Sequence, residues 1–143
     1  MMLPDVNVLI SAFRTDHPQH SVCRPWLVET VSRDARFGLS TIVLSAVVRI
    51  TTNGRIFKSP SSIREAFDFC ENLLAQPNCE PVEPGERHWD IFRNLCVQAD
   101  VRGPRVTDAW LAALAIESGS QWITLDRDFA RFQGLDWRVP AVW

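Results

Sequence analysis

Two aspartates each follow a short apolar run that is typical of a buried strand. Asp5 ends the apolar N-terminal segment, and Asp126 follows residues 121–125, the clearest strand pattern in the chain. In open parallel sheets, functional sites form outside the carboxyl ends of the strands. If both strands run parallel in one sheet, the two carboxylates emerge at the same edge of the protein.

A third aspartate, Asp108, is predicted to reach the same edge from a helix. That helix is expected over residues 107–118, with Thr107 as its N-cap and Gly119 as its stop. Positions 108, 111, 112 and 115 share one helical face, and the last three carry apolar side chains. This face should pack on the sheet, which leaves Asp108 at the top of a buried stripe and directed towards the strand ends.

Three carboxylates at close range can do metal chemistry. They repel one another and raise each other's pKa unless a cation joins them. Hard oxygen ligands in that number suit Mg²⁺ or Mn²⁺. Such an ion lowers the pKa of a bound water and stabilises the charge of an in-line attack on a phosphodiester. We therefore predict a metal site at Asp5, Asp108 and Asp126 that serves phosphodiester hydrolysis.

Asp128 lies two residues after Asp126 and has two interpretations. It is either a fourth catalytic acid or a cap for the turn at residues 129–132, and its residue type suits both roles. Aspartates are also common at helix starts and after strands for capping reasons, so spacing alone leaves that alternative open for the whole set. Glu117 falls on the opposite helical face from Asp108 and is interpreted as a solvated surface residue.

The elements that would position these acids alternate along the chain, which predicts an α/β sandwich with a mostly parallel sheet. Strands are expected at residues 1–5, 36–40, 79–82, 121–125 and 136–139. Helices are expected at residues 7–13, 19–32, 41–52, from the turn at 59–62 to about 74, from Pro84 onwards, at 107–118 and as a short turn at 128–132. In the helix at residues 19–32, the apolar stripe is expected to be Val22, Trp26, Leu27 and Val31. In the helix that ends near residue 74, it is expected to be Ile63, Phe67, Cys70 and Leu74.

Size and composition favour one soluble domain over residues 1–143. The formal net charge of -2 does not indicate a broadly cationic nucleic-acid binder, so basic contacts to a nucleic acid must be local. Lys58 is the only lysine, and three arginines, Arg14, Arg49 and Arg105, are candidates for such contacts. The four cysteines form no zinc-type spacing, and we expect no signal peptide, no bilayer-spanning segment and a cytoplasmic location.

Three segments, residues 3–9, 106–115 and 124–129, resemble the signature motifs of PIN domains. They occur in the family's order and at about its separation over nearly the whole chain. The similarity is strongest to the VapC group of bacterial toxins, which are ribonucleases held inactive by a VapB antitoxin.

The resemblance implies a PIN-like α/β/α sandwich and RNA cleavage, with structured RNA such as tRNA as a common target. It implies Mg²⁺ or Mn²⁺ at Asp5 and Asp108, with Asp126 completing the site and Asp128 assisting. Asn7 would hold the Asp5 loop and cap the first helix. The implied partners are an antitoxin whose C-terminal arm covers the groove and a second copy of the chain in a homodimer.

One position departs from the family pattern. Many PIN domains carry a glutamate on the helix after the second strand, but residues 41–49 contain no acid. Either Asp128 compensates or a second metal binds weakly, and the alternative function is a catalytically weakened PIN-like RNA- or protein-binding module. A phosphoaspartate hydrolase is disfavoured, because Asn7 stands where its second acid is needed and Lys58 is far from the motifs.

Overall fold

The computed structural model describes residues 1–141 and contains one sheet of five strands that all run parallel. The strands are β1 (Met2–Pro4), β2 (Phe37–Leu39), β3 (Cys79–Pro81), β4 (Gln121–Ile123) and β5 (Trp137–Arg138). Their order across the sheet is β3-β2-β1-β4-β5, which makes β1 the central strand. The predicted α/β fold with a parallel sheet is confirmed.

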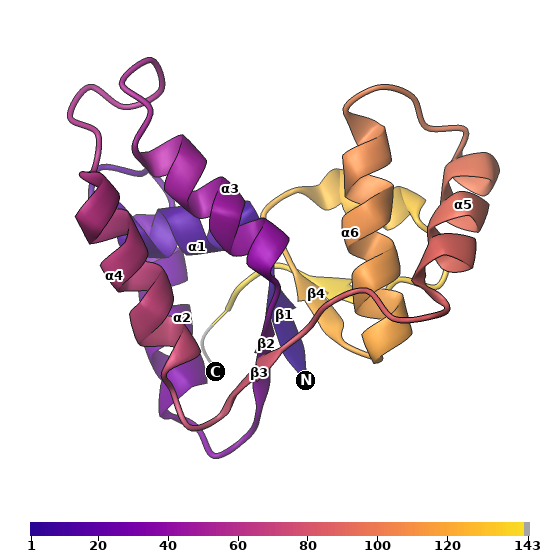
Figure 1. The fold of residues 1–143 in the computed structure, drawn as a ribbon, viewed down its shortest axis with the longest axis horizontal. Coiled ribbons are helices and arrows are strands. Elements are labelled where there is room, and N and C mark those ends of the chain that lie inside the picture. The colour runs from indigo at the N-terminus through magenta and orange to yellow at the C-terminus, as the bar shows by residue number, and fades with distance from the viewer. Residues whose placement is uncertain (142–143) are drawn as a thin grey trace.

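Helices cover both faces of the sheet. They are α1 (Val6–Phe13), α2 (His20–Ser32), α3 (Thr41–Thr51), α4 (Ile63–Leu74), α5 (His88–Ala99) and α6 (Arg105–Ser118), with a 3-10 turn η1 (Arg127–Arg131). Figure 1 shows α1 to α4 gathered on one side and α5 and α6 on the other. Because crossovers between parallel strands are right-handed, moving outwards from β1 to β3 puts helices on one face, and returning past β1 to β4 puts them on the other.

This strand order creates a crevice between β1 and β4. The chain leaves β1 towards α1 on one face and leaves β4 towards η1, next to α6, on the other. The loops after these neighbouring strands therefore diverge, and ligands of doubly wound sheets bind at such a point. Asp5 and Asp126 follow these two strands directly or within three residues, so the fold places both at the crevice.

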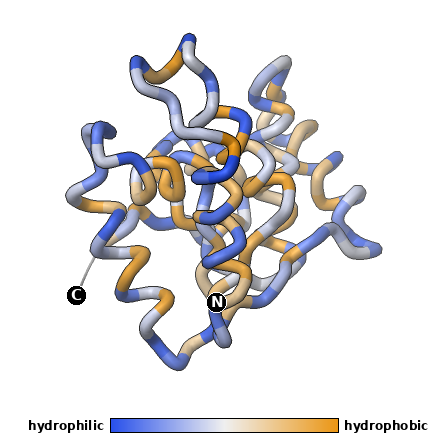
Figure 2. The backbone as a smooth tube through the Cα atoms, turned by 60° about the vertical axis from the view of Figure 1, so that its left-hand side comes forward, coloured by the Kyte–Doolittle hydropathy of each residue, from blue (hydrophilic) through white to orange (hydrophobic). Residues whose placement is uncertain are grey.

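The core lies between the sheet and its two helical layers. Leu3, Phe37, Leu39, Trp122 and Ile123 from the strands are all at most 1% exposed. On α6, small buried side chains allow the helix to approach the sheet closely; these are Ala109, Ala112, Ala113 and Ala115. Figure 2 shows hydrophobic segments towards the middle of the molecule and hydrophilic segments at the peripheral loops. Within residues 1–141, no helix is long and apolar enough to cross a membrane.

Pro4 is tolerated because it is the last residue of β1. The next residue restores the ladder, since the Asp5 N–H donates to the Ile123 carbonyl at 2.8 Å. N–H groups alternate sides along a strand, so the donor that Pro4 lacks would face β2. β1 pairs with β2 at Met2 and Phe37, before Pro4 is reached. The proline therefore ends β1 directly before the loop that begins at Asp5.

The predicted buried faces of α4 and α2 are only partly correct. On α4, Ile63, Phe67 and Leu74 are 42–58% exposed, and the buried face is instead Ala66, Cys70 and Leu73. On α2, Val22 is exposed and Cys23 is buried. In both helices two adjacent faces carry apolar side chains, so periodicity does not decide which face packs inwards.

Two predicted helix starts also differ. α6 begins at Arg105, after Gly103 with φ 56° and Pro104, so Thr107 is not its N-cap. The fixed φ of proline suits the first turn and starts the helix two residues early. Gly119 ends α6 with φ 66°, as predicted. α5 begins at His88 rather than near Pro84, because Glu117 accepts the N–H groups of Gly85 and Arg87. Glu117 is thus a half-buried structural acceptor rather than a solvated residue.

Candidate active site

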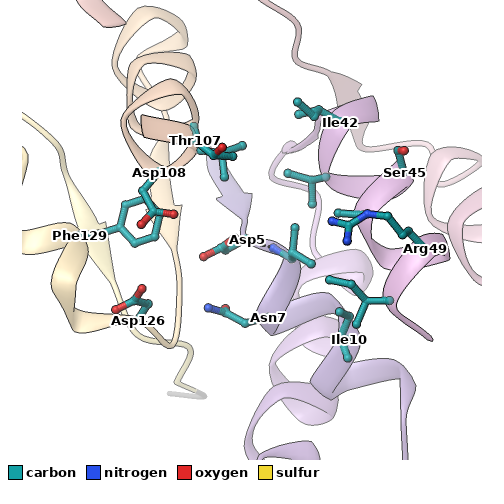
Figure 3. Close-up of a pocket in the computed structure, with 15 residues that line it drawn as sticks. Asp5, Asn7, Ile10, Ile42, Ser45, Arg49, Thr107, Asp108, Asp126 and Phe129 are labelled. Atoms are coloured by element: carbon teal, nitrogen blue, oxygen red, sulfur yellow. Dashed lines mark hydrogen bonds between the residues drawn. The ribbon is translucent and has the colours of Figure 1, made fainter. Parts of the chain in front are cut away.

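Asp5, Asp108 and Asp126 line one pocket of about 490 Å³ at the carboxyl edge of the sheet. Figure 3 shows Asp5 at the centre, Asp108 and Asp126 on one wall, and side chains of α1 and α3 on the other. The strand-end rule and the helical-face argument thus bring together the three acids named from the sequence. Asp128 does not line this pocket; it lies beside the neighbouring arginines Arg127 and Arg131.

Asp5 is held at the base of the pocket by two hydrogen bonds. Its Oδ1 accepts the Val6 N–H at 2.7 Å and caps α1, and its Oδ2 accepts the Thr124 hydroxyl at 2.6 Å. The residue is only 6% exposed. Burial raises the pKa of Asp5 to about 6; the two hydrogen bonds lower it, and the nearby Asp108 and Asp126 raise it again. This carboxylate is fixed in place but short of positive charge.

Thr124 was not predicted from the sequence as a site residue. It connects three parts of the site. Its hydroxyl donates to Asp5 and accepts the Asp126 N–H at 3.0 Å and the Asn7 amide at 3.3 Å. The only signal was its position in the same short motif, two residues before Asp126. Being fully buried at the end of β4, it joins the two loops that flank the crevice.

Asn7 stabilises this junction in a different way from the one expected. Its Oδ1 accepts the Leu125 N–H at 3.1 Å, and its amide donates to Thr124. The expected cap of α1 is not Asn7, because Asp5 occupies that position and bonds the first free N–H. Asn7 therefore ties α1 to the β4 loop, across 117 and 118 positions of sequence.

Asp108 projects into the pocket from the first turn of α6, with its side chain 26% exposed. Partial burial raises the pKa of Asp108, Arg105 opposes that shift, and Asp126 adds to it. The predicted direction towards the strand ends is therefore realised, although the helix begins earlier than expected.

Asp126, and not Asp128, takes the capping role that the sequence left open for Asp128. Asp126 is the N-cap of η1, since its Oδ1 accepts the Asp128 N–H at 2.9 Å. Asp128 is therefore not the cap. Its Oδ2 instead pairs with Arg105 at 2.8 Å and lies 3.9 Å from Arg131. Asp128 borders the acidic cluster through Arg105 rather than through the pocket.

The three candidate arginines have different surroundings. Arg14 is committed to the protein: it pairs with Asp16, donates to the carbonyl of Ser59 and the hydroxyl of Ser61, and packs on Phe57. Arg105 contacts the acids. Arg49 is exposed and lines the pocket, and within residues 1–141 its side chain has neither a hydrogen bond nor an ion pair.

The wall formed by α3 carries no acid, as the sequence indicated. Ile42, Ser45 and Arg49 face the pocket there, and Arg49 points towards Asp5 in Figure 3. The pocket consequently has an acidic wall on the α6 and β4 side and a basic, partly apolar wall on the α3 side.

The donor set fits a hard divalent cation that keeps part of its water shell. Asp5 is a buried carboxylate with two acidic neighbours and no ion pair of its own among the described residues, which is an environment that favours a cation. In residues 1–141, no three histidine, cysteine or acidic side chains stand close enough to hold one ion together. Mg²⁺ commonly binds through one or two carboxylates plus waters. Coordination by all of Asp5, Asp108 and Asp126 stays a prediction.

The sequence has named relatives that match it along nearly its whole length. Residues 2–135 match the family described as PIN domain. Ribonuclease VapC25 of Mycobacterium tuberculosis is 46% identical over 142 residues, which cover 99% of this chain and 100% of that protein. Ribonuclease VapC31 of the same species is 45% identical over 132 residues, or 92% of this chain and 93% of the relative.

Solved structures share the fold at lower identity. VapBC2 from Rickettsia felis, bound to a DNA fragment from its promoter, gives a TM-score of 0.72 at 16% identity, covering 97% of this chain and 98% of that chain. VapC20 of Mycobacterium tuberculosis, a sarcin-ricin loop cleaving toxin, gives 0.66 at 16% identity, covering 94% and 98%. PIN-domain nucleases of the VapC type generally use a divalent metal. The family match over most of the chain, the relatives above 40% identity and the acids at the β1–β4 crevice agree, and the chain belongs to the PIN domain family.

Proposed function

We propose that this chain is a single-domain, metal-dependent endoribonuclease and the toxin of a toxin–antitoxin pair. The main observation behind the proposal is that Asp5, Asp108 and Asp126, from three separate elements, line one pocket at the crevice between β1 and β4. Relatives named ribonucleases, identical at nearly half of their positions, support the same activity.

Mg²⁺ or Mn²⁺ is the proposed cofactor, with Asp5 and Asp108 as ligands and Asp126 completing the set. When bound, the ion supplies Lewis acidity to a water and to the scissile phosphate. Thr124 and the Val6 N–H fix both oxygens of Asp5, so this ligand needs no reorganisation when substrate arrives. Asp126 uses Oδ1 to hold η1, which leaves Oδ2 as the oxygen that would face the metal.

The RNA backbone is proposed to enter between the two walls. The Arg49 guanidinium has no partner within the described chain and points into the pocket, so it is available for a phosphate. Such a local contact is needed because a net charge of -2 gives the protein no overall attraction for a polyanion. Structured RNA such as tRNA is the proposed substrate class.

The proposed partners are a VapB-type antitoxin and a second copy of the chain. Solved VapBC structures from Rickettsia felis and Haemophilus influenzae and a toxin–antitoxin complex from Klebsiella pneumoniae share the fold and support the first. Homodimerisation is carried over from the family resemblance alone. All four cysteines are free thiols, which suits the reducing cytoplasm as the place of action.

A catalytically weakened binding module is the second candidate, and the acid-free wall of α3 is the observation in its favour. Such a module would bind RNA or protein without cleaving it. The two candidates differ in one measurable property, the loss of intact RNA in the presence of metal.

The test is incubation of the purified, antitoxin-free protein with total cellular RNA in Mg²⁺, in Mn²⁺ and in EDTA. Asp5→Asn and Asp108→Asn are compared with Asp34→Asn, an exposed aspartate before β2 and so at the opposite edge of the sheet. We expect discrete metal-dependent fragments from wild type and Asp34→Asn and none from the two pocket variants. Absence of cleavage by folded wild-type protein would favour the binding module, and cleavage by both pocket variants would refute the assigned site.

A further inference from the structure

Arg105 reaches all three carboxylates of the α6 and β4 wall. It is the first residue of α6, and its guanidinium lies 2.8 Å from Asp128, 3.5 Å from Asp108 and 3.8 Å from Asp126. One nitrogen, Nη2, contacts Asp128, and the other, Nη1, faces the two pocket acids. A single planar cation therefore spans the boundary between the pocket and its rim.

The contact with Asp128 is the one that fixes the guanidinium. It is the shortest of the three, and the pairs to Asp108 and Asp126 are longer than an ordinary hydrogen bond. The side chains of Arg105 and Asp126 are each 38% exposed, so water weakens these longer pairs. Arg105 is thus held at the edge of the pocket by Asp128 and forms only weak ion pairs with the two acids that are proposed to hold a metal.

The pocket acids carry negative charges that repel one another, and Arg105 partly neutralises them. Asp5, Asp108 and Asp126 line one pocket, and Asp108 and Asp126 both act to raise the pKa of Asp5. Apart from Arg105, no ion pair to these three acids is formed within residues 1–141. Without Arg105, the metal-free site would hold three negative charges with no paired cation.

We propose that Arg105 is a built-in counter-cation, which occupies the metal-facing side of Asp108 and Asp126 until a divalent ion displaces it and which Asp128 holds in position. This inference deepens the proposed function and rests on it. It assigns Asp128 a positioning role through Arg105 in place of a ligand role. It also implies that the chain has a lower metal affinity than its carboxylates alone would give, because an incoming ion must compete with a tethered positive charge.

The matched control for this proposal lies three residues earlier. Arg102 also pairs with an aspartate, Asp100, at 3.5 Å, but both side chains are more than 80% exposed and neither lines the pocket. Arg102→Gln therefore removes the same charge near the start of α6 without touching the acidic wall. Arg105→Lys is the second control, because it keeps the charge at the pocket while losing the forked geometry.

The experiment is calorimetric titration of Mn²⁺ into metal-free wild type, Arg105→Gln, Arg105→Lys and Arg102→Gln, with no RNA present. Loss of a partly solvated ion pair suggests a gain of about fivefold in Mn²⁺ affinity for Arg105→Gln. We expect Arg102→Gln and Arg105→Lys to stay within about twofold of wild type, since both keep the charge at the pocket. Thermal melts with and without Mn²⁺ report folding of each variant and give an independent measure of the same gain.

The results of the Mn²⁺ titrations separate failure of the counter-cation from failure of the metal site. An unchanged or weaker affinity in Arg105→Gln, with wild type binding Mn²⁺, overturns the counter-cation and leaves the proposed nuclease site intact. An equal gain in Arg105→Lys also overturns it, because charge would not be the cause. Absence of Mn²⁺ binding in every variant overturns both the counter-cation and the proposed metal site.

Discussion

Replacement of Asp5 by asparagine should stabilise the metal-free protein at neutral and alkaline pH. Asp5 is buried, and its pKa is raised from 3.8 to about 6. A folded-state pKa above the unfolded value means that folding favours the protonated form. The cost is therefore absent below the unfolded pKa, develops as pH rises from 3.8 to about 6, and is complete above that range.

The size of the effect follows from the shift. At 1.36 kcal/mol per pKa unit, burial of the charged Asp5 costs about 3 kcal/mol above pH 7. Asparagine keeps an oxygen for the Val6 N–H but deprives Thr124 of its anionic acceptor, a loss of about 1 kcal/mol. The net gain is about 2 kcal/mol near pH 8 and close to zero near pH 4.5, where the charge costs only about 1 kcal/mol.

The assay is thermal unfolding of Asp5→Asn and wild type in EDTA between pH 4.5 and 8.5. For a chain of this length we expect Tm of the variant to lie about 6 °C above wild type at pH 8 and to match it near pH 4.5. Asp34→Asn, an exposed aspartate, should follow wild type throughout. A difference in Tm that is constant with pH, or that falls as pH rises, would refute the reasoning, because the buried charge of Asp5 would then not be its source.

Three further perturbations test other parts of the structure. Thr124→Val removes a hydrogen bond that lowers the pKa of Asp5, so that pKa should rise above about 6 in the metal-free protein, as followed by NMR titration of the Asp5 carboxyl carbon. Arg49→Ala should raise KM for RNA at least severalfold with little change in Mn²⁺ affinity, which kinetics and calorimetry separate, and an unchanged KM would contradict its phosphate role. Gly38→Ala should destabilise the fold by about 1–3 kcal/mol in denaturant unfolding, because its new Cβ would lie 2.6 Å from Val82 Cγ2; a loss too small to measure would mean that Val82 moves aside.

The acids of the site could be predicted because backbone geometry alone places them. Asp5 and Asp126 follow parallel strands, and Asp108 sits on a helix whose small residues mark the face that packs on the sheet. These inferences need only the period of each element and the position of strand ends.

The partners of those acids could not be predicted in the same way. Thr124 and Asp5 are 119 positions apart, and Arg105 and Asp128 are 23 apart, so their contacts exist only once the chain is packed. The capping rule selected Thr107 as the N-cap of α6, because a hydroxyl cap is a strong local preference. Here the positive φ of Gly103 and the fixed φ of Pro104 turn the chain into the helix earlier.

The missing glutamate on α3 changes the electrostatics of the pocket as well as its ligand count. With no acid on that wall and Arg49 directed inwards, a cation is attracted only towards Asp5, Asp108 and Asp126. A metal held by these acids and Arg49 on the facing wall would attract an RNA phosphate from opposite sides and restrain it across the groove. A glutamate at this wall would add a second metal-binding position but would compete for Arg49. We therefore expect a site of this kind to bind one metal strongly, and restoring the acid by Ala46→Glu, on the pocket-lining face of α3, should raise the number of Mn²⁺ ions bound while weakening RNA binding.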